Sequence, residues 1–256
     1  MRVLLTNDDG VASPGLLALT RAMKNVAETF VVAPVEERSA ASHAITIHKP
    51  LRVTPAVVGD TGVAAWATNG TPADCIVLGL LDLLASPPDV VISGINVGAN
   101  LGMDLIYSGT VSAAVEAALF GIAAVAISVA AFKDIHWDVA AAFAADLVQA
   151  VARHSLPPDT FLNVNIPNLP AAEIRGVEVT RQSSRRYVTR LERRSDPRGR
   201  DYYWIGGSPE GEEGVPGTDT RAVAEGWISV TPLRLDMTDG ELGPVIRSWH
   251  LSIPGR

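Results

Sequence analysis

The sequence has a single cysteine and no long uninterrupted hydrophobic run, and each shortage excludes a kind of protein. Because Cys75 stands alone, neither an intramolecular disulfide nor a cysteine-based zinc site can form. One of the most apolar stretches, residues 111–131, is interrupted by Glu116 and Gly121, which is not typical of a membrane span. The first ten residues lack the basic and apolar segments of a signal peptide. We therefore expect a cytoplasmic protein without a membrane partner.

Acidic residues outnumber basic residues in the chain as a whole, but one segment is strongly basic. The formal net charge of the 256 residues is −7, which argues against a protein that coats nucleic acid or an anionic membrane. Residues 181–200 nevertheless hold eight arginines against Glu192 and Asp196, a local charge of +6, and leave −13 on the rest of the chain. We expect this segment to contact the acidic body of a neighbouring protomer rather than nucleic acid.

The order of apolar runs and amphipathic stretches predicts an α/β fold with a parallel sheet. Residues 3–5 and 30–34 are short apolar runs typical of strands buried on both faces, and a helical pattern separates them as in a βαβ unit. Further strands are predicted at 89–93, 123–129 and 161–166, an extended segment at 44–53, and helices at 73–84, 111–120 and 135–153. Residues 94–110 contain four glycines and are predicted to form a long loop, which in a compact domain is usually functional.

The pattern changes after residue 170, so we divide the chain into a core of residues 1–170 and a C-terminal region of residues 171–256. Two alternating stretches flank the turn-forming residues 195–199 and predict a β-hairpin arm at about 181–206. A helical turn at 219–225, a strand at 227–235 and a short helix at 245–251 complete the expected elements.

The first predicted strand ends at two adjacent acids, Asp8 and Asp9, followed by Gly10. Open α/β sheets bind their ligands at the carboxyl ends of the strands, and Mg²⁺ or Mn²⁺ is usually held by one or two carboxylates with water. Two carboxylates at this edge therefore suggest a divalent metal site. The alternative is an ordinary turn in which Asp9 caps a helix.

Ser39 follows the second predicted strand and Asn96 follows the third, so both belong to the same edge of the sheet as Asp8. A hydroxyl and an amide carbonyl are suitable neutral ligands for a hard cation. Either residue could instead stabilise its own loop. Three strands that each deliver an oxygen to one edge form the stronger argument for the metal site.

The segment Ser108-Gly109-Thr110 precedes the predicted helix at 111–120. The free N–H groups and the dipole of a helix N-terminus bind phosphate, and Gly109 permits close approach of the backbone. The alternative is an ordinary Ser/Thr cap. Asn100, four residues after Asn96, could contact substrate. A metal beside a phosphate clamp predicts metal-assisted hydrolysis of a phosphate ester, with a metal-activated water as the nucleophile.

Two other functions fit parts of this pattern. A phosphatase that forms an aspartyl-phosphate needs Asp-x-Asp spacing after the first strand, whereas these acids are adjacent. A non-enzymatic nucleotide-binding or scaffold protein would use the arginine-rich hairpin, but no G-x-G-x-x-G follows the first strand to hold a dinucleotide.

The motifs LLTNDDG, VVAPVEERSAAS, NGTPADCI, SGINVGANLG, MDLIYSGTVSAA and DPRGRDYYWIG, in this order, resemble the SurE family of metal-dependent 5′(3′)-nucleotidases. The resemblance implies a Rossmann-like three-layer core, a projecting hairpin, and a C-terminal segment exchanged between subunits in a homodimer or homotetramer. It implies hydrolysis of nucleoside monophosphates, and of short polyphosphate, with one divalent cation (Mg²⁺ or Mn²⁺) per subunit. The implied metal ligands are Asp8, Asp9, Ser39 and Asn96, with Asp8 and Asp9 also catalytic, and the implied phosphate-binding residues are Asn100, Ser108, Gly109 and Thr110.

One segment departs from the family pattern. Ala40 and His43 stand where family members usually carry glycine and asparagine. His43 could contact phosphate or donate a proton to the leaving group. We interpret it instead as a surface substitution and leave it out of the catalytic set.

Overall fold

A computed structural model describes residues 1–211 and 214–253, and its centre is a nine-stranded sheet in the order β3-β4-β2-β1-β5-β6-β7-β11-β8. The pairs β1–β2, β1–β5, β2–β4, β5–β6 and β6–β7 are parallel, whereas β3 and β11 each run antiparallel to their neighbours β4 and β7. The strands are β1 (Arg2–Thr6), β2 (Glu28–Pro34), β3 (Val53–Ala56), β4 (Ala64–Thr68), β5 (Val90–Val97), β6 (Ala123–Val129), β7 (Thr160–Ile166), β8 (Gly176–Val179) and β11 (Trp227–Arg234).

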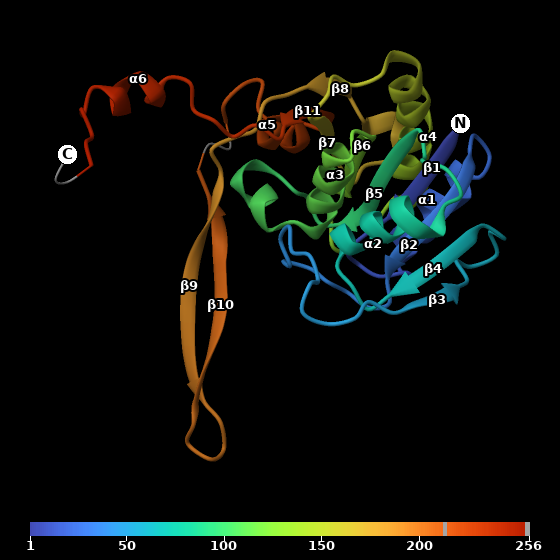
Figure 1. The fold of residues 1–256 in the computed structure, drawn as a ribbon, viewed down its shortest axis with the longest axis horizontal. Coiled ribbons are helices and arrows are strands. Elements are labelled where there is room, and N and C mark those ends of the chain that lie inside the picture. Colours follow the sequence, from blue (N-terminus) through green and yellow to red (C-terminus); the bar gives the residue numbers. More distant parts are fainter. Residues whose placement is uncertain (212–213, 254–256) are drawn as a thin grey trace.

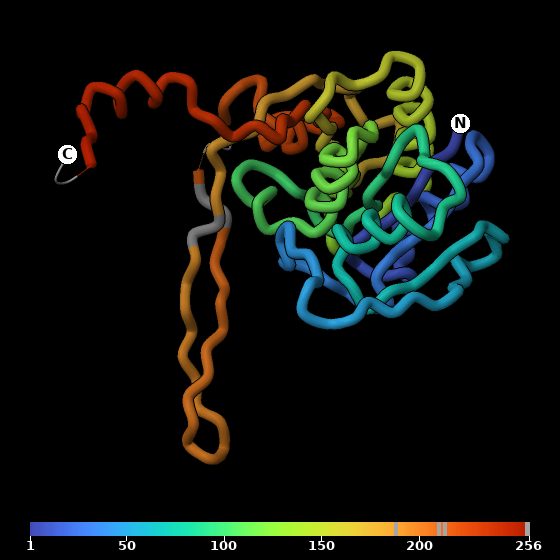
Figure 2. The backbone as a smooth tube through the Cα atoms, viewed as in Figure 1, coloured from blue at the N-terminus to red at the C-terminus, as the bar shows by residue number. Residues whose placement is uncertain are grey.

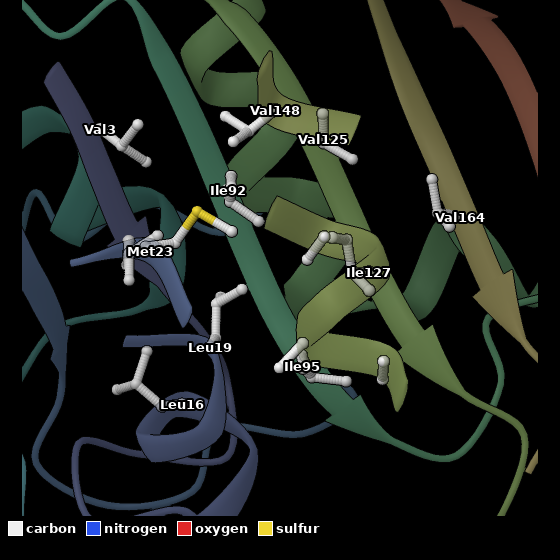
Figure 3. Close-up of a cluster of buried hydrophobic side chains, with 14 of the residues drawn as sticks. Val3, Leu16, Leu19, Met23, Ile92, Ile95, Val125, Ile127, Val148 and Val164 are labelled. Carbon is white, nitrogen blue, oxygen red and sulfur yellow. The ribbon is translucent and has the colours of Figure 1, made fainter. Parts of the chain in front are cut away.

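Helices cover both faces of the sheet, because alternate residues of the buried strands point to opposite sides. On one face, Val3 and Leu5 belong to one buried cluster with side chains of α1 (Pro14–Met23) and α4 (Trp137–His154). Figure 3 shows Val3 in this cluster, together with Leu16, Leu19 and Met23 of α1 and Val148 of α4. On the other face, Leu4 packs with α2 (Pro72–Leu78) and α3 (Gly109–Leu119). The predicted three-layer α/β core is confirmed, and folds of this kind bind ligands at the carboxyl ends of their central strands.

Local side chains fix where these helices begin. Ser13 accepts the N–H of Leu16 ahead of Pro14, and Thr71 forms a capping box with Asp74. The helix predicted at 73–84 is shorter than expected, since the α-helix ends at Leu78 and the chain continues as a π-helical turn, Gly79–Leu83. The π-turn therefore replaces the second half of the predicted helix.

Two predictions for the core were wrong. Of the extended segment 44–53, only Val53 belongs to a strand, because Thr46 bonds to Asp74 instead of to a sheet. The loop predicted at 94–110 is not continuous either. β5 runs on to Val97, where Asn96 and Val97 pair with β6, and a 3₁₀ helix, Gly102–Tyr107, follows.

One part of the C-terminal region extends the central sheet, and another part projects from the body of the molecule. β11 pairs with β7 and β8 pairs with β11, so the sheet continues past residue 170, and α5 (Asp219–Ala224) packs beside β11. The predicted hairpin is confirmed as β9 (Arg186–Ser195) and β10 (Asp201–Glu210), an arm that projects from the body (Figures 1 and 2). A 3₁₀ turn, Ala171–Glu173, precedes β8.

The chain after β11 extends away from the body and carries a short helix, α6 (Leu242–Arg247) (Figure 1). This helix begins and ends earlier than the predicted 245–251. Exchange of this segment between subunits stays a prediction, as does the division of the chain at residue 170. Within the described residues, no helix is both long and apolar enough to cross a bilayer.

Candidate metal and phosphate site

The carboxyl ends of β1 and β5, and the loop that follows β2, surround one cleft of about 570 Å³. Six of the eight predicted site residues line it. Gly109 and Thr110 are not among the lining residues but contact Asp8 from the start of α3. The cleft is lined by Asp8, Asp9, Glu37, Ser39, Ala40, Asn96, Val97, Gly98, Ala99, Asn100, Asp104, Tyr107, Ser108 and Phe132.

Asp8 is buried and Asp9 is half-buried at the end of β1. The hydroxyl of Thr110 donates to Asp8 Oδ1 at 2.5 Å, and the backbone N–H of Val97 donates to Asp9 Oδ2 at 3.3 Å. Gly10 follows with φ +97°, a conformation that turns the chain away from the strand direction. Both carboxylates thus face the same cleft although they are adjacent in sequence.

Burial raises the pKa of both acids, because desolvation disfavours the charged form. The pKa of Asp8 is raised mainly by burial, against the hydrogen bond from Thr110, which lowers it. Burial, and then repulsion from Asp8, raises the pKa of Asp9 from 3.8 to about 6. No basic side chain forms an ion pair with either acid within residues 1–211 and 214–253. A cation in the cleft would compensate both charges.

Gly109 allows the N-terminus of α3 to approach Asp8 closely. A Cβ at this position would lie 2.8 Å from both Cβ and Oδ2 of Asp8, so no larger residue fits without moving the carboxylate. Ser108 caps the helix by accepting the N–H of Val111 at 3.1 Å, and it lines the cleft. The hydroxyl of Thr110 donates its proton to Asp8, so this hydroxyl orients the Asp8 carboxylate rather than donating to a phosphate.

The two neutral ligands predicted for the metal reach the cleft from different segments. Ser39 is exposed, and its hydroxyl donates to Glu37 Oε1 at 2.7 Å. The amide nitrogen of Asn96 donates to the carbonyl oxygens of Gly98 at 2.7 Å and Val97 at 3.2 Å. These bonds leave the side-chain carbonyl oxygen of Asn96 as the atom that can accept or ligate.

The donors in this cleft fit a hard divalent cation. Two carboxylates, a hydroxyl and an amide carbonyl are all oxygen ligands, the set that Mg²⁺ and Mn²⁺ prefer. Among the described residues, no group of three or more His, Cys, Asp or Glu side chains is placed to hold a metal. An ion here would therefore rely on Asp8 and Asp9 for charge and on neutral oxygens and water for the rest of its shell.

Asn100 is held by polar side chains beneath the cleft that the sequence reasoning missed. Its N–H donates to Asn165 Oδ1 at 2.8 Å, and its side-chain amide donates to Ser128 Oγ at 2.7 Å. Its backbone carbonyl oxygen accepts hydrogen bonds from the side-chain amides of Asn163 at 3.0 Å and Asn165 at 2.9 Å. The signal was present in the buried strand TFLNVNI, where two asparagines at a spacing of two occupy one face.

Eight of the fourteen lining residues were not predicted, and four of them have acidic or aromatic side chains. Glu37 and Asp104 add carboxylates, and the place of Glu37 two residues before Ser39 was a visible clue. Tyr107 and Phe132 add exposed aromatic rings at 63% and 80% exposure. Nothing in the local pattern after β6 marked Phe132 as a cleft residue.

His43 does not line the cleft. Its Nε2 lies 2.7 Å from Glu116 Oε2 on α3, so the residue ties the loop after β2 to that helix. This contact agrees with its omission from the catalytic set.

Comparisons with known proteins agree with the geometry. A family model described as Survival protein SurE matches residues 3–189. The chain is 51% identical over 253 residues to the 5′-nucleotidase SurE of Geobacter sulfurreducens, covering 98% of this chain and 95% of that protein. It is 48% identical over 249 residues to the 5′-nucleotidase SurE of Heliobacterium modesticaldum, covering 97% and 92% of the two chains. The crystal structure of the SurE protein from Aquifex aeolicus matches with a TM-score of 0.84 and 42% identity, covering 98% of this chain and 100% of that one. On this sequence and structural similarity, the chain belongs to the SurE family.

Proposed function

We propose that this protein is a metal-dependent 5′-nucleotidase that hydrolyses nucleoside monophosphates to nucleoside and phosphate. The observation that carries the proposal is the pair of carboxylates formed by buried Asp8 and half-buried Asp9. Both face a cleft beside the N-terminus of α3, and neither forms an ion pair with a basic side chain among the described residues. The relatives named as 5′-nucleotidases support the same reaction class.

Asp8, Asp9, Ser39 and Asn96 would hold one Mg²⁺ or Mn²⁺. When bound, such an ion neutralises phosphoryl oxygens and lowers the pKa of a water that attacks phosphorus. Thr110 keeps Asp8 in place through its hydroxyl, and the N–H of Val97 does the same for Asp9. Uncatalysed hydrolysis of phosphate monoesters is extremely slow, so preorganised charge is the main contribution that these residues can make.

The phosphate would lie against Ser108 and Gly109, where free N–H groups at the helix N-terminus favour an anion. Asn100 would contact it from the opposite wall. The nucleoside would then extend toward the rim, where Tyr107 and Phe132 offer aromatic surfaces. Stacking on such surfaces tolerates different bases, so we expect broad use of nucleotides. Activity on 3′ esters and on short polyphosphate belongs to the same proposal.

The test is phosphate release from adenosine 5′-monophosphate by protein stripped of metal and then titrated with Mn²⁺ or Mg²⁺. We expect release only with metal, and loss of at least about 10²-fold in kcat/KM for Asp8→Asn, because a ligand and its charge are removed. Asp60→Asn, at an exposed acid paired with Arg21, is the matched control. Metal-independent release, or full activity of Asp8→Asn, would refute the proposal. Adenosine 3′-monophosphate and tripolyphosphate, run in parallel, decide the wider substrate range.

A further inference from the structure

Asp219 is an acid of the C-terminal region whose side chain is fully buried, with 0% exposure, at the start of α5. Its Oδ2 accepts the backbone N–H of Gly102 at 2.8 Å. Its Oδ1 accepts the N–H of Ser183 at 3.0 Å and the N–H of Thr220 at 2.7 Å. One carboxylate therefore joins the segment after β5, the root of the hairpin arm and α5.

Gly102 is held on every side at this junction. Its carbonyl oxygen accepts from Gln182 Nε2 at 2.7 Å, and the next residue, Met103, donates its N–H to Arg185 O at 2.7 Å. Gly102 has φ +58°, and a Cβ there would lie 2.5 Å from Arg185 O. Only glycine fits this turn without strain, and both of its backbone polar groups are bonded to residues of the C-terminal region.

The residues on either side of Gly102 line the candidate active site. Asn100 precedes it by two positions, and Asp104 and Tyr107 follow it. We call residues 98–108 the cleft wall. Gly102 does not line the cleft itself. It lies between the lining residues, so its position determines where residues 98–101 and 103–108 lie.

The bond from Asp219 to Gly102 is not explained by helix capping. A first-turn acid of α5 needs only its local contact with Thr220 and the helix dipole. Within the described residues no basic side chain forms an ion pair with Asp219, so its charge rests on N–H and O–H donors alone. Burying such a carboxylate is costly unless donors compensate it, and here the donors come from segments 36 and 117 residues away.

We infer that Asp219 is a positioning residue. Its hydrogen bonds attach the cleft wall to the root of the hairpin arm and so hold Asn100 and Tyr107 where they can contact the substrate. The inference rests on the proposed nucleotidase function. It also reaches beyond the part of the chain that the family model matches, which ends at residue 189. Asp219 does not touch substrate, and it acts through Gly102.

The experiment compares Asp219→Asn with Asp74→Asn. Asp74 is a matched control because it is 3% exposed, lies in the first turn of α2 and accepts three hydrogen bonds from Thr46 and Thr71, yet does not line the cleft. Both variants should lower the Tm. Only Asp219→Asn should raise the KM for adenosine 5′-monophosphate, by about tenfold, because a loosened wall loses contacts made in both the ground and transition states, while kcat stays within about threefold.

Two further readouts separate positioning from general destabilisation. Hydrogen exchange of residues 98–108 should accelerate in Asp219→Asn and not in Asp74→Asn. The affinity for Mn²⁺, measured by calorimetry, should stay within about threefold of wild type in both, since Asp8 and Asp9 follow β1 and lie outside the cleft wall. A parallel rise in KM for both variants, or unchanged KM in Asp219→Asn, would overturn the inference.

Gln182→Ala covers the case in which Asp219→Asn does not fold. It removes the other side-chain bond to Gly102 from a partly exposed position, and we expect a smaller rise in KM, about threefold. Unchanged KM in a folded Gln182→Ala would then contradict the inference. Wild-type protein that releases no phosphate with any metal would instead refute the proposed function, so the two failures are distinguishable.

Discussion

At the scale of single residues, Asp8 and Asp9 illustrate a conflict between stability and function. Two acids that share a cleft repel one another, and burial raises the pKa of each. In the metal-free protein at neutral pH, the repulsion and the burial of these charges both lower the free energy of unfolding. A bound cation would remove the conflict, because its charge favours the ionised form of both carboxylates.

This conflict predicts the effect of Asp9→Asn on stability. The pKa of Asp9 is about 6 in the folded chain against 3.8 for the free side chain, so its stabilising contribution is complete below about 3.8 and is lost as the pH rises through about 6. Metal-free Asp9→Asn should therefore melt above wild type at pH 7, by about 2 °C or more, with the difference shrinking toward pH 4. Scanning fluorimetry in chelator at pH 4, 5, 6 and 7 measures it.

The control for this prediction is Asp60→Asn, because its exposed acid pairs with Arg21 and its pKa is lowered by that contact. It should not raise the Tm at any of these pH values. Addition of Mn²⁺ should stabilise wild type but not Asp9→Asn. A metal-free Asp9→Asn protein that melts below wild type at pH 7 would contradict this account of the carboxylate pair.

Gly109 gives a second prediction at this scale. In Gly109→Ala the new Cβ would lie 2.8 Å from Asp8, and the contacted atoms include Asp8 Cβ, which cannot move unless the backbone that follows β1 moves with it. We expect kcat/KM to fall by about 10²-fold, the size of effect that a displacement near 1 Å produces. Gly79→Ala is the control, because its Cβ would also lie 2.8 Å from a neighbour, the flexible end of Leu4 in the core. That variant should lose stability and keep its activity.

At the scale of elements, the predictable parts were those that a short stretch of sequence determines. The strand at 123–129 has the predicted bounds, and the helix predicted at 135–153 is displaced by only one or two residues from Trp137–His154. Apolar periodicity, a Ser-Pro start and the turn at 195–199 are local signals, and each was followed by the expected element.

The elements that were mispredicted depend on partners far away in the sequence. Residues 44–52 look extended, but Thr46 bonds to Asp74, 28 positions later. β5 continues through Asn96 and Val97 because β6 pairs with it there. The site shows the same division. That Asp8, Asp9, Ser39 and Asn96 line one cleft could be predicted from strand ends, whereas the place of Phe132 in the cleft and the bond from Gly102 to Asp219 depend on the tertiary fold.

The loop after β2 gives a prediction at this scale. Ser42 donates to Ile106 O at 2.7 Å, and His43 pairs with Glu116 at 2.7 Å, so this loop is attached to the 3₁₀ helix and to α3. We expect His43→Ala to lower the free energy of unfolding by about 1 kcal/mol or less, as the loss of a partly exposed polar contact does. Since His43 does not line the cleft, kcat should stay within about threefold. A steady-state assay and a urea titration test this, and a loss of kcat beyond about tenfold would make His43 a catalytic residue after all.

At the scale of the whole molecule, charge and exposed apolar side chains both point to association. The arginine-rich arm extends into solvent from a body of opposite net charge. The chain after β11 exposes Val245, Trp249 and Leu251 at 49%, 58% and 76% while it extends away from its own body. Apolar side chains gathered on a protruding segment are typical of an interface.

We therefore expect the full-length protein to sediment as a dimer or tetramer at micromolar concentration. Two variants separate the contributions of the projecting elements. Ending the chain at Asp236 removes the apolar segment, and replacing residues 189–207 with Asn-Gly shortens the arm between the paired residues Val188 and Ser208. Each should give a smaller assembly by analytical ultracentrifugation and keep measurable phosphate release, because the lining residues of the cleft all lie within residues 8–132. The arm contacts, being charged, should also weaken in high salt, whereas the apolar contacts of the C-terminal segment should not. A full-length monomer, or an assembly that both variants leave unchanged, would show that these two elements serve something other than self-association.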